Sequence, residues 1–530
     1  MNVYGVLGMK KSIVQSRRTV QASCVLLGGL LCNLLAGCNV GPKYVPPSMT
    51  APAAFKESPE QFKEQDGWTV AQPQDATLRG KWWEIYNDPE LNALEEQLNI
   101  DNQNIRESFE NFMEARSLVR EARSQFFPTL SIGPSYSRSQ TSANISNGQT
   151  AGGSSTTVTS SSTGSTGRQS QVFALPLEVS WEPDLWDKVR NTVRANQYNA
   201  QLSAADLENE KLTEQASLAE YFFEIRGQDA LQKILDDTVE TDKRDVEAQK
   251  ARYETGVDDQ ISLVEAQTSL ASAQSSAINL GIARAQYEHA IATLIGKPAS
   301  SFSIPVKPVT TAPPPIPVGL PSQLLERRPD VAAAERNMAA ANAQIGVAYA
   351  AYYPALTLSG SGGVESSAIG KLLEASSRYW SMGPGVSETI YDGGLRRATV
   401  NQYIATYNGD LAAYRQTVLT AFQQVEDSLS QVRILGQQIE RQQEAVDSSQ
   451  NYVRLEKARY DTGIDPYIAL ETAEVTLLSN MQTLADLQIQ QMTASVQLIQ
   501  ALGGGWDRTQ LPTPVQVTQK PSPAETSIQH

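Results

Sequence analysis

Hydrophobic positions recur every three or four residues over several long stretches of the chain. One run keeps these steps throughout: Tyr407, Leu411, Tyr414, Val418, Phe422, Val425, Leu429 and Val432. This spacing is typical of helices that pack as coiled coils. It predicts long helices over residues 187–252 and 395–459, each roughly 100 Å at about 1.5 Å per residue. Two returning helices of roughly 55 Å are predicted over residues 260–295 and 467–502.

Between the helical stretches the hydrophobic period falls to two. Apolar side chains there alternate with small or polar ones, as in Leu130, Ile132 and Tyr136 against Ser131, Gly133 and Ser137. Strands with one apolar and one small, polar face are typical of membrane β-barrels. Half-buried strands of a soluble sandwich would show a similar pattern. We predict four strands, at about residues 129–138, 172–182, 355–361 and 379–391.

The helical pattern is duplicated. Residues 250–257 read Lys-Ala-Arg-Tyr-Glu-Thr-Gly-Val, and residues 457–464 read Lys-Ala-Arg-Tyr-Asp-Thr-Gly-Ile. Glycine after a basic helical segment ends a helix, because glycine adopts positive φ at little cost. Asp258 and Asp465 follow where a new helix would take its N-cap. Each copy therefore predicts the tight tip of a helical hairpin, at about residues 253–258 and 460–465.

Weaker matches extend the duplication over most of the chain. Residues 126–132 match 352–358 at an offset of 226, whereas the tips match at an offset of 207. The first copy therefore has a longer loop, over residues 139–170, where Ser, Thr, Gly and Asn dominate. We assign residues 81–300 to the first copy and 331–505 to the second.

The start of the chain predicts export. A cationic segment precedes an apolar run that ends in Leu35-Ala36-Gly37-Cys38, and this sequence looks like a bacterial lipobox. We interpret residues 1–37 as a lipoprotein signal peptide and Cys38 as the site of acylation. An ordinary signal peptide with an incidental cysteine is the alternative. Residues 38–80 are predicted as an acylated, irregular, proline-containing segment.

The remaining segments are predicted as connections. Residues 301–330 form an inter-repeat linker, and residues 506–530 form a proline-rich, disordered tail. Four strands cannot close a barrel, and open strand edges are not tolerated in lipid. The chain is therefore expected to oligomerise.

Composition excludes several classes of function. The net charge of −15 argues against nucleic acid as a partner. Two histidines and three cysteines give no basis for a metal site, a disulfide framework or a histidine-based nucleophile, and no cofactor is expected. Glu471 and Glu474 lie one helical turn apart and could pair as catalytic carboxylates, but such pairs usually form a solvated helix face. We expect no enzyme activity.

Several motifs resemble the TolC-like outer membrane factors, in particular the lipoprotein branch of the OprM/NodT type. Residues 325–335 read Leu-Glu-Arg-Arg-Pro-Asp-Val-Ala-Ala-Ala-Glu, and residues 40–44 read Val-Gly-Pro-Lys-Tyr. Trp82-Trp83 and residues 391–394, Tyr-Asp-Gly-Gly, add to the resemblance. One departure is Asp187, where the family often has Gly, which puts the local turn in doubt.

The resemblance implies a mainly α fold with a membrane β-barrel. Three chains would share a twelve-stranded β-barrel and a long periplasmic α-helical barrel made of antiparallel hairpins. Such a homotrimer is the exit duct of a tripartite efflux pump. It sits in the Gram-negative outer membrane in contact with lipid, and its partners are a periplasmic adaptor (membrane fusion) protein and an inner membrane RND-type transporter. The runner-up functions are a duct for type I protein secretion and a coiled-coil scaffold without a pore.

The resemblance also suggests two sites. Adaptor docking is expected at the tips, whose residues are Thr255, Gly256, Val257, Thr462, Gly463 and Ile464. Many family members place an Asp just beyond the second tip to narrow the duct. The matching position here is Thr472, flanked by glutamates. We therefore expect the periplasmic constriction among Tyr460, Asp465, Glu471, Glu474 and, in the first copy, Glu265, with carboxylates that favour cations.

Overall fold

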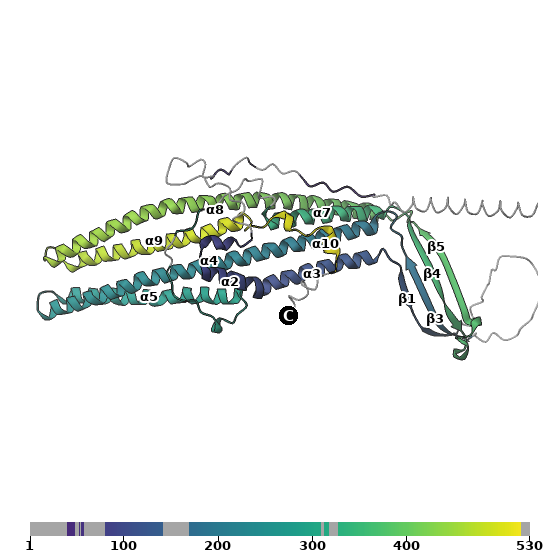
Figure 1. Cartoon of the computed structure of the whole chain (residues 1–530), viewed down its shortest axis with the longest axis horizontal. Coiled ribbons are helices and arrows are strands. Elements are labelled where there is room, and N and C mark those ends of the chain that lie inside the picture. The colour runs from purple at the N-terminus through teal and green to yellow at the C-terminus, as the bar shows by residue number, and fades with distance from the viewer. Residues whose placement is uncertain are drawn as a thin grey trace, which may run out of the picture. The chain divides into compact units, whose positions relative to one another are not determined.

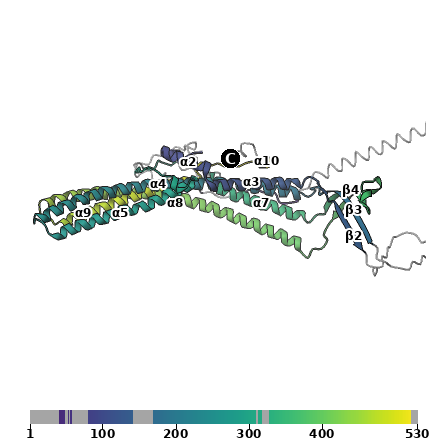
Figure 2. The ribbon, with the colours of Figure 1, turned by 90° about the horizontal axis from the view of Figure 1, so that it is seen from below.

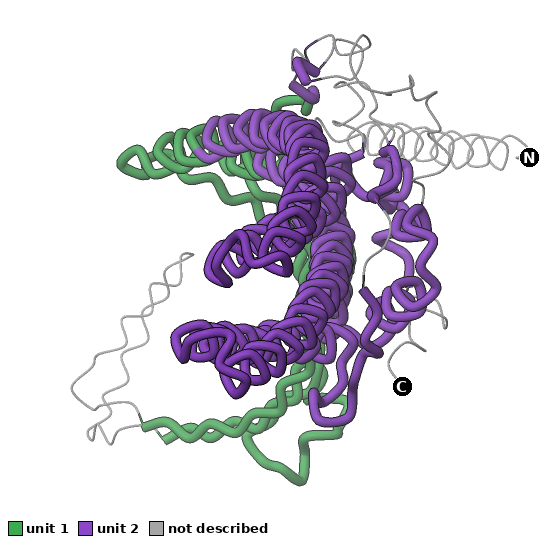
Figure 3. Tube along the Cα trace, turned by 90° about the vertical axis from the view of Figure 1, so that its left-hand side faces the viewer, with its two compact units in different colours: residues 1–44, 119–195, 342–405 green, residues 45–118, 196–341, 406–530 purple. Residues whose placement is uncertain are grey.

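The computed structural model describes residues 40–47, 52, 55–57, 80–140, 169–308, 312–316 and 327–520 (Figure 1). The chain forms two compact units (Figure 3). Unit 1 comprises Val119–Ala195 and Asn342–Ala405 with the described residues 40–44, and unit 2 comprises the other described residues. Cys38 and the predicted signal peptide lie outside the described residues. So do most of the acylated segment, residues 141–168 of the long loop and parts of the linker.

Unit 1 contains an antiparallel sheet. Its strands are β1 (Thr129–Ile132), β2 (Ser135–Gln140), β3 (Gln169–Trp181), β4 (Ala355–Ser366) and β5 (Arg378–Ser387). The order is β1-β3-β4-β5, and β2 also pairs with β3. The sequence predicted one strand over residues 129–138, and the structure divides it into β1 and β2. Pro134, which has no N–H to give to a ladder, lies at the break.

The predicted alternation is present in these strands. Trp380, Met382 and Val386 of β5 are all largely exposed, as are Leu130 and Ile132 of β1. A sheet with such a large apolar face needs an apolar environment or a partner to cover it. Two predicted strand ends need correction: β5 ends at Ser387, four residues before its predicted end, and β4 extends five residues beyond its predicted end.

Asp187 lies at the position where the resembled family often has Gly. It adopts φ +57, in the left-handed region, and is one of two described non-glycine residues with positive φ. Asp tolerates this conformation better than most residues. Its carboxylate is buried and accepts from the guanidinium of Arg190 at 2.5 Å. Next to it, Trp186 stacks on Tyr353 with ring centroids 4.8 Å apart. The turn between strand and helix is therefore retained.

Unit 2 contains the two helical hairpins. The first consists of α4 (Lys188–Glu254) and α5 (Gln260–Leu294), and the second of α8 (Leu395–Asp461) and α9 (Tyr467–Ala501). The first turns of α4 and α8 belong to unit 1. Each long helix has 67 residues and each returning helix has 35. Figures 1 and 2 show the antiparallel pairs. The predicted lengths are confirmed, and the two copies keep a constant offset of 207 through all four helices.

Three helical elements precede the first strand: η2 (Trp82–Tyr86), α2 (Pro89–Asp101) and α3 (Gln103–Ser124). In the second copy, α7 (Pro329–Ala350) is the counterpart of α3 at the offset of 226. Asn102, in extended conformation, separates α2 from α3. Its amide donates to Glu214 at 3.1 Å and to the carbonyl oxygen of Leu294 at 2.9 Å, and its side-chain oxygen caps α3. The core beside it includes Trp82 and Phe222.

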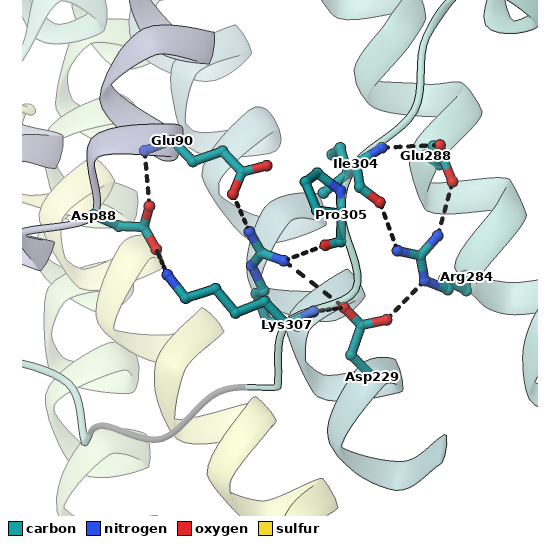
Figure 4. Close-up of polar contacts among 9 residues, drawn as sticks. Asp88, Glu90, Asp229, Arg284, Glu288, Ile304, Pro305 and Lys307 are labelled. Carbon is teal, nitrogen blue, oxygen red and sulfur yellow. Dashed lines mark hydrogen bonds and ion pairs between the residues drawn. The ribbon is translucent and has the colours of Figure 1, made fainter. Parts of the chain in front are cut away.

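Charged side chains hold the first part of the linker against α4 and α5 (Figure 4). The guanidinium of Arg284 donates to the carboxylate of Asp229 at 2.7 Å and to the carbonyl oxygen of Ile304 at 2.8 Å. The buried Arg226 donates to the carbonyl oxygen of Pro305 at 2.7 Å. These side chains satisfy backbone groups of a segment that has no regular structure of its own.

The tail is ordered as far as residue 520, so the prediction of disorder from residue 506 is wrong for this part. The 3-10 helix η6 (Arg508–Gln510) and α10 (Pro514–Thr518) follow the buried Trp506. Thr513 and Gln516 form a capping box for α10, and Pro514 is at N1, where proline favours a helix start. In this tail, proline marks a helix start.

Within the described ranges, no helix combines the length and the apolar character that a membrane span requires.

Candidate functional site: the tip loops and the junction of α4 with α9

The two tip loops have the same backbone geometry. Gly256 and Gly463 both adopt φ +74. The N–H of Val257 donates to the carbonyl oxygen of Arg252 at 2.9 Å, and the N–H of Ile464 makes the equivalent bond to Arg459 at 2.9 Å. With the bonds from the two glycine N–H groups, these contacts form a Schellman motif at the end of each long helix. The predicted tips are therefore real turns that require glycine.

The tip residues leave a bare surface. All six predicted tip residues are exposed, and Val257 and Ile464 keep 66% and 65% of their surface accessible. A Cβ added to Gly256 or Gly463 would meet no atom within 4 Å. Thr255 and Thr462 turn their hydroxyls back to helix carbonyl oxygens, at 2.9 and 3.0 Å. Each tip therefore presents mainly backbone and one aliphatic side chain.

The predicted N-caps need correction. Asp259, one residue later than predicted, caps α5 by accepting from the N–H groups of Ile261 and Ser262, both at 3.1 Å. The residue before α9 is Pro466, which provides no side-chain cap. Asp465 instead pairs with the guanidinium of Arg459, with one contact at 3.0 Å. The two returning helices therefore start differently, although their tips match.

Tyr460 lies between helices, with only 8% of its surface exposed. Its hydroxyl donates to Gln249 Oε1 at 3.0 Å and accepts from Nε2 of the same side chain at 2.7 Å. The guanidinium of Arg252 lies 4.7 Å from its ring centroid, and the ring of Tyr467 meets it edge-on at 5.8 Å. Tyr460 therefore connects α8 to α4.

Glu471 and Glu474 of α9 lie near Asp242 and Asp245 of α4, two residues that were not predicted from the sequence. Burial, and next the charge of Asp245, raise the pKa of Glu474 to about 7. Burial, with the charges of Asp245 and Glu471, raises the pKa of Asp242 to about 6. The hydroxyl of Ser269 on α5 donates to Glu471. Glu265 is half-buried on α5 and is not among the charges that shift these groups.

We call Asp242, Asp245, Glu471 and Glu474 the acidic junction. Among the described residues, no group of three or more His, Cys, Asp or Glu side chains is placed to hold a metal ion. The sequence did contain a signal for the two missed members. Asp242 and Asp245 have the same three-residue spacing as Glu471 and Glu474, so each pair lies on one helix face.

These features define a class of protein: a channel subunit with an apolar sheet and duplicated, very long helical hairpins. The chain belongs to the outer membrane efflux protein family, whose model matches residues 94–297 and 320–504. It therefore functions in the outer membrane, as a component of an efflux system.

Individual relatives agree with this assignment. The toluene efflux pump outer membrane protein TtgC of Pseudomonas putida is 28% identical over 475 residues, which cover 89% of this chain and 94% of TtgC. The outer membrane protein OprJ of Pseudomonas aeruginosa is 29% identical over 503 residues, covering 90% of this chain and 95% of OprJ. The solved outer-membrane channel OprN matches with a TM-score of 0.77 and 26% identity, over 88% of this chain and 100% of OprN.

Proposed function

We propose that the chain is the exit duct of a tripartite efflux pump. Three copies share a twelve-stranded β-barrel in the outer membrane and a helical tunnel in the periplasm. A periplasmic adaptor and an inner membrane RND-type transporter complete the pump. The observation that carries the proposal is the pair of equal hairpins, each of which ends in the same bare turn. Each hairpin follows two strand positions of the sheet: β1 and β2, which both pair with β3, count as one position beside β3, and β4 and β5 are the other two.

The need for several copies is supported by the sheet. Within the described part of the chain, β5 pairs only with β4, and β1 and β2 pair only with β3. Unpaired strand edges cannot face lipid, because their N–H and C=O groups would lose hydrogen bonds. Further copies supply those partners. Purified protein in mild detergent should therefore have the mass of a trimer, and a uniform monomer would contradict the assembly.

The duct conducts small molecules passively, and the transporter provides the energy. TtgC is named for toluene efflux, which favours drugs, solvents or other toxic compounds as cargo. Metal ions are a further proposed cargo. Susceptibility profiling of a deletion strain is the test. We expect increased sensitivity to several unrelated compounds, restored by the wild-type gene. A strain with unchanged susceptibility but a missing secreted protein would favour type I secretion instead.

The tips are the proposed contact with the adaptor. Bare backbone at Gly256 and Gly463 lets another helical hairpin approach closely, and Val257 and Ile464 add aliphatic contacts. Gly256→Trp and Gly463→Trp should leave assembly intact but abolish efflux and adaptor cross-linking. Gly→Asn at the same positions is the control, since Asn tolerates positive φ and adds little bulk. Full resistance in both Trp variants would exclude the tips as the docking site.

Cys38 is the proposed lipid attachment site. Only a thiol at this position accepts the acyl chain, so Cys38→Ser should no longer incorporate labelled palmitate. The strands hold the protein in the membrane independently of the lipid, so insertion should persist. Labelling of the Ser variant would contradict acylation at Cys38.

The constriction is proposed to involve the acidic junction. Carboxylates on α9 beside those on α4 would attract cations if they face the duct. Glu471→Gln with Glu474→Gln should reduce cation selectivity and change single-channel conductance. Glu265→Gln and Asp465→Asn test the other predicted positions. Unchanged conductance and selectivity in the Glu471/Glu474 variant would remove the acidic junction from the constriction.

A further inference from the structure

Aromatic side chains mark both ends of the sheet. At one end, Tyr136 of β2 packs on Phe173 of β3 with ring centroids 4.7 Å apart. At the other end, where strands join helices, Trp181 ends β3, and Trp186 stacks on Tyr353 at 4.8 Å. From Phe173 to Trp181 the strand rises about 26 Å at about 3.3 Å per residue, close to the apolar band of about 25 Å in membrane barrels. Aromatic residues concentrate at membrane surfaces, so the pair at Trp186 marks one surface of the proposed barrel.

A cavity of about 230 Å³ lies at this end of the sheet, within unit 1. Its lining comes from three connections between strands and helices: residues 182–189, residues 350–356 and residues 387–389. The stacked Trp186 and Tyr353 take part in the lining. So does Leu356 of β4, whose partner across the strands is Val386, with 71% of its surface exposed. Paired residues share a face of the sheet, so the cavity lies beside the apolar face.

The charges around the cavity are unequal. Glu182, Asp184 and Glu388 provide carboxylates, and Lys188 provides the ammonium group. Glu182 lies 3.4 Å from Lys188 Nζ, and Asp184 accepts from two backbone N–H groups at the start of α4, both at 3.0 Å. Glu388 is exposed, and no ion pair involves it in the part of the chain that the structure describes. A carboxylate beside an apolar membrane face is costly unless a cation pairs with it, so this position favours a cationic group.

We propose that the cavity binds the headgroup of a phospholipid that carries a phosphate and a primary ammonium group, as phosphatidylethanolamine does. The ammonium group donates to Glu388. The phosphate accepts from Lys188, whose ammonium group has three donors and shares only one contact with Glu182. The acyl chains lie on the apolar face along Leu356 and Val386. This inference rests on the proposed function, because it requires the sheet to lie in a membrane.

The size and the charge of the cavity agree with a headgroup. A volume of about 230 Å³ is below the roughly 300–1,000 Å³ of pockets that enclose a whole drug-sized ligand. A phospholipid without an ammonium group, such as phosphatidylglycerol, would provide the phosphate for Lys188 but no cation for Glu388. The site should therefore prefer phosphatidylethanolamine.

Lipid binding to the assembled protein in mild detergent tests the site. The protein is titrated with phosphatidylethanolamine or with phosphatidylglycerol of the same acyl chains, and native mass spectrometry measures the bound lipid. Wild type should bind phosphatidylethanolamine more tightly. Glu388→Gln should reduce this preference by about twofold to fivefold, the effect of an ion pair at a partly exposed site. Lys188→Gln should weaken the binding of both lipids, because both carry a phosphate.

The matched control is Glu365→Gln, which removes a carboxylate near the opposite end of β4. It should keep the preference of wild type. Glu365 and Glu388 are both exposed, so both variants should assemble as wild type does, which their mass checks. An equal loss of preference in the two variants would show an effect of overall charge and would overturn the site.

The outcomes separate this inference from the function proposed above. If the protein is a trimer that restores resistance, and wild type and Glu388→Gln have the same preference, the headgroup site is wrong while the duct stands. Equal binding of the two lipids by wild type has the same meaning. Protein that is recovered from the periplasm without detergent would overturn both the site and the membrane barrel.

Discussion

The two hairpins agree in backbone and differ in charge. Their helices have equal lengths and their tips have the same Schellman bonds. The acidic junction nevertheless occurs only where α9 meets α4. The positions equivalent to its four carboxylates are all neutral: Ser449, Tyr452, Val264 and Gln267. The duplication therefore preserved the dimensions that let helices pack, while side chains at equivalent places diverged.

This difference shows which constraints belong to the architecture. Tip geometry and helix length are common to both copies, so they are constraints on both hairpins. The acidic junction is particular to the contact of α9 with α4. Any pH response of this region should therefore come from the contact of α9 with α4, and the equivalent neutral positions provide internal controls.

The largest expected effect comes from Gly227→Ile, which gives α4 the residue that α8 has at Ile434. The added side chain would overlap Ile489, and overpacking of this kind costs about 2–3 kcal/mol. The reverse change, Ile434→Gly, should cost about 1 kcal/mol, mainly through helix propensity. The urea midpoint of purified protein measures both. Adding Ile489→Ala should recover part of the loss in Gly227→Ile. Equal stability of Gly227→Ile and wild type would contradict the close approach of α4 and α9.

The second prediction concerns pH. Burial, and next the charge of Asp245, raise the pKa of Glu474 from its ordinary value of 4.5 to about 7, so ionisation costs more in the folded state. The free energy of unfolding should fall as pH rises from about 4.5 to 7. Because Glu474 is only partly buried and solvent screens its charge, we expect Glu474→Gln to add only about 1 kcal/mol at pH 8.

The gain should disappear below about pH 4.5, where both states bind the proton. Urea midpoints at pH 4 and pH 8 measure the difference. The control is Gln267→Glu, which places a carboxylate at the equivalent position of α5 and should show a smaller pH dependence. A pH-independent gain in Glu474→Gln would contradict the assigned ionisation.

The third prediction concerns the start of α5. Asp259→Ala removes the side-chain cap from two N–H groups and should cost about 1 kcal/mol. Hydrogen exchange of the Ile261 and Ser262 amides should become faster, while the first turn of α9 is unaffected. Unchanged exchange at both amides would mean that the cap contributes nothing.

The smallest effect is expected from Asp465→Ala. Its carboxylate pairs with Arg459 on the surface, and exposed ion pairs contribute little to stability because solvent screens them. The first turn of α9 should exchange at the wild-type rate, because Asp465 is not its cap. An increase as large as that of Asp259→Ala would show that Asp465 does cap α9.

The sequence predicted the features that depend on local periodicity. Heptad spacing and paired glycines were sufficient for the helix lengths and both tips, and alternation located the strands. The break between α2 and α3 at Asn102 does not follow from local periodicity, because its side chain bonds Glu214 and Leu294, which lie far away in sequence. The acidic junction was half missed for a similar reason. Which face of α4 packs on α9 depends on how the two helices are aligned with each other, and this alignment cannot be read from the sequence of either helix alone.

The equal lengths of the hairpins also limit how such a gene can change. A single deleted codon in α4 would rotate the rest of the helix by about 100° and turn its packing faces away from their partners. Deletion of seven codons would keep the packing faces in place. The tip would then lie about 10 Å out of line unless the returning helix and the other hairpin were shortened as well. Viable changes in length are therefore whole heptads, made in all four helices together.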